Sequence, residues 1–114
     1  MNDLTKYVGA LVSVSTKYGK EYGMVDGVFC DQLGFVSGCE TEWDTRLVNV
    51  QDVEECVTDD ERTKARQSAT WYYTNEIDSL QRRIKMQYKK DDPKKLQYML
   101  TSCLKWFGGL QGVH

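Results

Sequence analysis

The chain has 114 residues and a formal net charge of −2; 40% of the residues are hydrophobic and 11% are aromatic. This size and composition predict one small domain, or a small domain with an attached element, and argue against intrinsic disorder. No apolar run approaches the roughly 18 residues of a membrane span, and the first residues lack the pattern of a secretory signal. We therefore expect a cytoplasmic protein with no membrane partner.

The first part of the chain, residues 1–57, alternates apolar and polar residues in the manner of short β-strands. The strands expected are residues 8–15, 21–30, 35–37, 46–50 and 53–57, the last two forming a pair. Gly19 suits a tight turn, Gly23 and Gly27 indicate bulges or bends, and residues 40–45 are expected to form a loop around Trp43. Five short strands with glycine bends predict a small, strongly bent barrel.

Three motifs in this region resemble the opening of an SH3-like barrel of the Sm-like and Tudor-like kind. They are the strand at residues 7–14, the Gly-Lys turn at residues 18–21 and the Gly-x-Val strand at residues 23–28. Residues 48–54 also resemble the short turn before the final strand of such barrels. The resemblance covers residues 4–57 and implies a five-stranded barrel. Residues 31–35 lack the Asn-based base-binding motif of Sm-like proteins, so RNA binding is not expected of the barrel.

The second part of the chain changes to a helical period. Thr58 and Glu61 form a capping-box pattern that predicts the start of a helix, and Asp78 and Arg82 are spaced to pair on its surface. The helix is expected to end near Asp91. Its apolar stripe, at spacings of three and four, is Ala69, Tyr73, Ile77, Leu80, Ile84 and Tyr88.

A second helix is predicted to follow at once. Asp92 can cap it, Pro93 suits its first position, and Gly108-Gly109 are expected to stop it. Its apolar side is Leu96, Met99, Leu100, Cys103, Leu104 and Phe107. The expected fold is therefore α+β, with an acidic SH3-like β-barrel at residues 1–57, a basic antiparallel helical hairpin at residues 58–109 and a tail at residues 110–114.

The two expected helices differ in length, at about 32 and 15 residues, or roughly 48 and 22 Å. Part of the longer helix must therefore pack against the barrel, against a second copy of the chain or against a different protein. Trp71, Tyr72 and Tyr73 lie in that part, and aromatic clusters are typical interface anchors. A homodimer through the hairpin is one prediction, and docking on the chain's own barrel is the alternative.

Residues for catalysis are scarce. The one histidine, His114, is the last residue, and Cys30, Cys39, Cys56 and Cys103 show no Cys-x-x-Cys spacing for zinc. The glycines form no phosphate-binding motif, and the acidic loop residues have no spacing that demands paired carboxylates. We expect no enzyme, no cofactor and no metal.

The uneven distribution of charge along the chain suggests two binding hypotheses. Residues 1–61 hold 4 basic and 13 acidic side chains, whereas residues 62–114 hold 11 basic and 4 acidic ones. The first hypothesis is a protein-binding module, an adaptor or inhibitor, that uses Trp43, Trp71, Tyr72 and Tyr73; in style it resembles small phage-encoded inhibitors of host defence or transcription proteins. The alternative is nucleic-acid binding by the basic tip of the hairpin. Its residues would be Arg82, Arg83, Lys85, Lys89, Lys90, Lys94 and Lys95.

Overall fold

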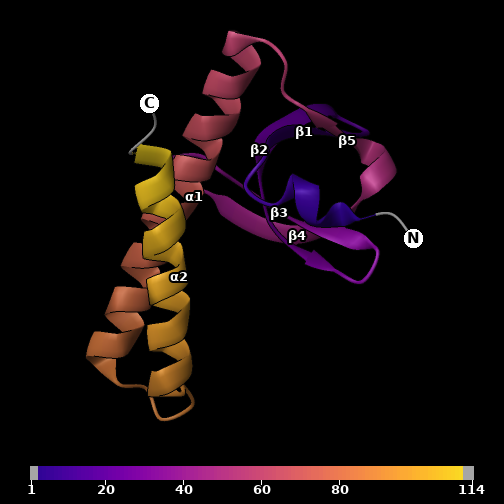
Figure 1. Ribbon diagram of the computed structural model, residues 1–114. Helices are drawn as coiled ribbons and strands as arrows, with labels where there is room; N and C mark the ends of the chain where they lie inside the picture. The colour runs from indigo at the N-terminus through magenta and orange to yellow at the C-terminus, as the bar shows by residue number, and fades with distance from the viewer. Residues whose placement is uncertain (1–2, 112–114) are drawn as a thin grey trace. The chain divides into compact units, whose positions relative to one another are not determined.

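The computed structural model describes residues 3–111 and shows an α+β protein (Figure 1). The chain divides into two compact units, which we call unit 1 (Met1–Tyr72) and unit 2 (Tyr73–His114). The elements are η1 (Leu4–Tyr7), β1 (Leu11–Thr16), β2 (Gly19–Phe29), β3 (Gln32–Gly38), β4 (Trp43–Asn49), η2 (Val50–Asp52), β5 (Val53–Glu55), α1 (Asp59–Met86) and α2 (Pro93–Gln111). The unit boundary therefore falls within α1, so the sheet and the first part of that helix form one unit.

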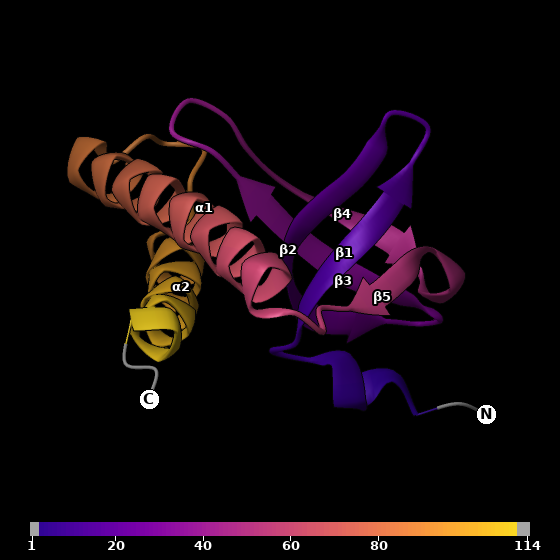
Figure 2. The same ribbon diagram turned by 90° about the horizontal axis from the view of Figure 1, so that it is seen from above.

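The five strands of unit 1 form one antiparallel sheet in the order β4-β3-β2-β1-β5. Gly19, at φ +121°, ends the β1–β2 turn in a conformation that favours glycine, as the sequence predicted. The β2–β3 register shifts between Val25 and Gly27, which confirms a bulge at Gly27. The sheet curls strongly (Figures 1 and 2), and it is not closed into a barrel, since among residues 3–111 β4 and β5 do not pair.

The inner face of the curled sheet carries the core of unit 1. Strand residues two positions apart point to the same face, so alternate apolar residues meet there. The buried members are Val12, Val14, Val25, Leu33, Phe35, Val48 and Val53. Gly23 allows the tight coiling of β2, because a Cβ at this position would lie 2.1 Å from the carbonyl oxygen of Val36.

The other face of β3 is covered by the first part of α1. A Cβ at Gly38 would lie 2.9 Å from the backbone nitrogen of Tyr72, and the amide of Gly38 donates to Ser68 Oγ at 2.9 Å. Val36 lies two positions from Gly38 and faces the same way. Ala65 and Ala69 are fully buried, and their small side chains allow the helix to approach closely. The first part of α1 therefore packs on the sheet of its own chain.

Unit 2 is an antiparallel pair of helices, with α2 running back beside the second part of α1 (Figures 1 and 2). Its core is small and aliphatic. Leu80, Leu96 and Leu100 are buried, with Ile77, Ile84, Met99 and Cys103 packed around them. Both predicted starts are confirmed: Glu61 N–H donates to Thr58 Oγ1 at 3.1 Å, and Lys94 N–H donates to Asp92 at 3.0 Å.

Several strand predictions need correction. β3 is longer than residues 35–37 because it pairs along its whole length with β4. Residues 43–45 are not a loop, since β4 begins at Trp43. The two final strands do not pair with each other, because β5 pairs with β1 instead.

The helix ends also differ from the predictions. α1 ends at Met86 rather than near Asp91, because Gln87 takes φ +53° and Asp91 turns back to Arg83. α2 continues through Gly108-Gly109 to Gln111, so these glycines do not stop it, and Leu110 and Gln111 are helical rather than part of a tail. The rest of the predicted tail, including His114, lies outside the described residues. No helix in residues 3–111 has the length and apolar character of a membrane span.

Candidate functional site

One hollow of unit 1 is an open groove of about 840 Å³ at one end of the sheet. We call it the groove. The beginning of β2, the end of β3, the turn that follows and the beginning of β4 supply most of its wall. Lys64 and Ser68 of α1 supply the rest. The groove therefore exists because the close contact at Gly38 brings the helix to the sheet.

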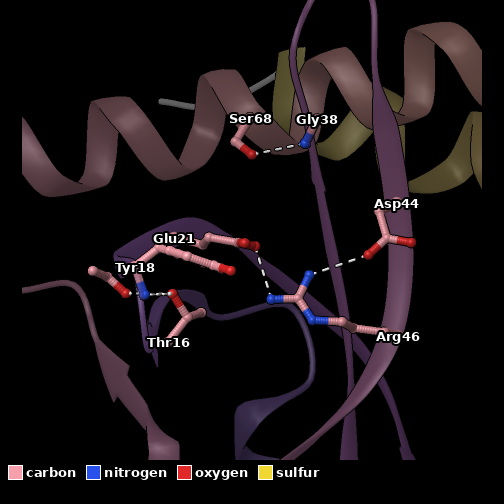
Figure 3. A network of polar contacts seen from close by, with 8 residues as sticks. Thr16, Tyr18, Glu21, Gly38, Asp44, Arg46 and Ser68 are labelled. Carbon is pink, nitrogen blue, oxygen red and sulfur yellow. Dashed lines mark hydrogen bonds and ion pairs between the residues drawn. The ribbon is translucent and has the colours of Figure 1, made fainter.

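Arg46 occupies the sheet side of the groove and connects two strands that are not neighbours (Figure 3). Its guanidinium donates to Glu21 of β2 at 2.8 Å and to Asp44 of β4 at 3.1 Å. It also lies over the ring of Phe35, 5.2 Å from the centroid. Partial burial opposes its charged form, but the two acidic partners raise the pKa of Arg46 above its usual value. Arg46 is therefore a fixed part of the wall.

Trp43 gives the groove an exposed aromatic side chain. It pairs with Gly38 at the β3–β4 edge of the groove and keeps 41% of its surface accessible. Tyr22 lies on the helix side, with Lys64 Nζ 5.4 Å from its ring centroid. The groove thus combines two aromatic rings with carboxylates and cations.

The turn after β3 contributes an exposed cysteine to the groove. Cys39 N–H donates to the Glu42 carbonyl at 2.7 Å and closes the turn. Backbone N–H groups of Thr41 and Glu42 lower the pKa of the Cys39 thiol, because they stabilise the thiolate. No role was predicted for Cys39 from the sequence, because this environment arises only in the folded turn.

The four aromatic residues proposed as interface anchors separate into two groups. Trp43 is exposed in the groove and Trp71 is partly exposed. Tyr72 and Tyr73 are 7% and 2% exposed, so they are packing residues of α1 in this structure. Tyr22 of β2 and Arg46 of β4 were not predicted as site residues from the sequence, and they line the same groove as Trp43.

The seven cations of the hairpin tip also separate into two groups. Arg82 pairs with Asp78, as predicted, and Arg83 pairs with Asp91 at 2.8 Å. The remaining five form no ion pair with another described residue: Lys85, Lys89, Lys90, Lys94 and Lys95. All five are exposed. The structure thus distinguishes two structural arginines from five available lysines.

Within residues 3–111, no three His, Cys, Asp or Glu side chains lie together as a metal ligand set. No disulfide joins the four cysteines, and Cys56 is buried. No protein-family model matches the chain, and neither a curated protein nor a solved structure matches it.

Proposed function

We propose that the protein is a non-enzymatic protein-binding module, an adaptor or inhibitor, and that the groove of unit 1 receives a segment of its partner. The observation that carries this proposal is the exposed Trp43 at the edge of an open groove. Tryptophan is enriched among the residues that dominate binding energies, because its large ring loses much water-exposed surface on contact. Because Arg46 already fixes the wall of the groove, little conformational entropy is lost when a partner binds, and this favours binding.

The charge of unit 1 supports a partner segment with basic side chains. Residues 1–72 contain 7 basic and 13 acidic side chains, a balance of −6. Arg46 neutralises part of the groove's negative charge, but Glu42 lines the groove and forms no ion pair with another described residue. A Lys or Arg of the partner beside Glu42 would also lie near the Trp43 ring, where a cation is attracted.

The SH3-like resemblance is part of the same proposal. Two features of unit 1 support it: β5 returns to pair with β1, and η2 occupies the short turn before the final strand. A small bent sheet of this kind presents its loops at one end, where variable binding residues can be held by a rigid scaffold.

A homodimer through the hairpin stays a separate prediction. The exposed apolar side chains Tyr98 and Leu104 of α2 support it. A dimer mass in light scattering at high micromolar concentration is the expected result, and a monomer mass there would remove the prediction.

The test of the groove is a comparison of two aromatic-to-alanine variants. Trp43→Ala removes the exposed ring from the groove, whereas Tyr18→Ala removes an 88% exposed ring from the β1–β2 turn, outside it. With a partner identified by nuclease-treated affinity capture, we expect Trp43→Ala to weaken binding by about 2 kcal/mol or more in calorimetry. Tyr18→Ala should bind as the parent does. Equal affinities of Trp43→Ala and the parent would contradict the proposal.

A further inference from the structure

The turn between α1 and α2 gathers positive charge that unit 2 does not use internally. Within residues 82–95 the two arginines have acidic partners, while the five lysines have none among the described residues. Asp91 is occupied by Arg83, and Asp92 caps α2 through the Lys94 amide. Both acidic residues of the turn therefore have structural roles, and the lysines keep their charge for an external anion.

The same turn contains a hollow of about 450 Å³, lined by Arg83, Tyr88, Lys90 and Asp91. Arg83 donates to the two carboxylate oxygens of Asp91 at 2.8 and 3.4 Å, and this bidentate contact fixes its guanidinium. The pairing lowers the pKa of Asp91 and raises that of Arg83, which keeps both groups charged. The hollow is therefore a built feature of the turn.

The backbone of the turn holds Tyr88 as one of the residues that line this hollow. Gln87 takes the left-handed conformation, at φ +53°, and ends α1. The next residues form a turn in which Asp91 N–H donates to the Tyr88 carbonyl at 3.1 Å. Tyr88 keeps 49% of its surface exposed. An exposed flat ring thus stands among lysines, beside a fixed guanidinium.

We propose that this turn binds single-stranded nucleic acid, with a base stacked on Tyr88 and the neighbouring phosphates held by the five lysines. A single strand alternates anionic groups with exposed flat rings, which matches the alternation of cations and an exposed ring in the turn. A duplex hides the faces of its bases, so it would leave Tyr88 without a role. This site is independent of the groove in unit 1 and adds a second binding activity to the proposed one.

The first test measures the binding of fluorescein-labelled 12-nucleotide single-stranded RNA and DNA to the full chain by fluorescence anisotropy. If all five lysines contact phosphates, a plot of the logarithm of the association constant against the logarithm of the salt concentration should have a slope of about −3.5. Lys89→Glu with Lys90→Glu should reduce the slope to about −2 and weaken binding at least tenfold. Lys6→Glu with Lys17→Glu, the same change of charge in unit 1, is the matched control and should bind as the parent does.

The second test separates stacking from simple attraction to an anion. Tyr88→Ala should weaken binding about tenfold, Tyr88→Phe should restore it, and Tyr18→Ala should leave it unchanged. Circular dichroism of each variant checks that helix content is retained. Any one of three results would overturn the proposal: no binding at 50 mM salt, equal losses in both double-lysine variants, or equal affinity of Tyr88→Ala and the parent. Tighter binding to anionic lipid vesicles or to duplex than to the single strand would also overturn it. A preference for RNA or for DNA identifies the natural strand and supports the proposal either way.

Discussion

Units 1 and 2 differ in how their cations are arranged along the chain. In unit 1, Arg46 bridges two carboxylates, Lys20 lies 3.7 Å from Glu54 and Lys64 lies 3.2 Å from Asp60. In unit 2, five lysines around one turn have no acidic partner among the described residues. The net charge of −2 conceals this difference. A cluster of cations in the sequence therefore predicts a binding surface only after the cations with an acidic partner in the fold have been excluded.

The two units also differ in how tightly the backbone is packed. In unit 1, glycines lie where strands or a helix come within contact of the backbone, as at Gly23 and Gly38. In unit 2, a Cβ at Gly108 or Gly109 would meet nothing within 4 Å. The same residue type therefore has a steric role in one unit and none in the other.

The largest expected effect tests whether the glycines of the two units differ in their steric role. Gly23→Ala should destabilise the protein by about 3 kcal/mol or more, because the new Cβ would collide with a backbone carbonyl that cannot move freely. Gly108→Ala should instead stabilise it by about 0.5–1 kcal/mol, because alanine favours an open helical position. Urea unfolding of both variants measures the difference. Changes of the same sign would show that the two glycines are not distinguished by packing.

A smaller effect tests the turn of unit 2. Gln87→Gly should stabilise the chain by about 0.5–1 kcal/mol, since glycine adopts a positive φ without steric cost. Gln81→Gly, an exposed position inside α1, should destabilise it by about 1 kcal/mol. Thermal unfolding followed at 222 nm compares the two variants. If both variants are less stable than the parent, the positive φ of Gln87 at the end of α1 is not present in solution.

The smallest effect concerns pH and unit 1. Asp26 sits at the β2 bulge, and burial raises the pKa of its carboxyl. The folded state therefore prefers the protonated form, so this group lowers the free energy of unfolding as pH rises through its unfolded and then its folded pKa. Asp26→Asn should be more stable than the parent at pH 7, and the gain should disappear below about pH 4. The free energy of unfolding is measured by urea unfolding at each pH. If Asp26→Asn is still more stable than the parent at pH 3, the gain is due to packing and not to charge.

Much of the fold was predictable because its signals are local. The capping box at Thr58, the Asp92-Pro93 helix start and the change from strand to helix period each depend on neighbouring residues. The ends of elements were not predictable in the same way. α2 passes through two glycines despite glycine's low helix propensity, and the half-buried Phe107 and Leu110 lie on either side of them.

The candidate site was only partly predictable. Trp43 was identified from the sequence, but Tyr22 and Ser68 line the same groove only after the sheet curls and α1 docks at Gly38. Tyr72 and Tyr73 gave the same sequence signal as Trp43, yet they are buried. An aromatic residue therefore indicates a large contact, and only the fold shows whether the contact is internal.

The central claim is that the two units carry two separate binding surfaces, and a nuclear magnetic resonance titration tests it most directly. The ¹⁵N-labelled full chain is titrated with the single-stranded RNA 12-mer while amide and indole signals are followed. We predict shifts at residues 85–95, with the Trp43 indole and the Gly38 amide unchanged. Shifts at Trp43 and Gly38, or none at residues 85–95 at saturating RNA, would contradict the account.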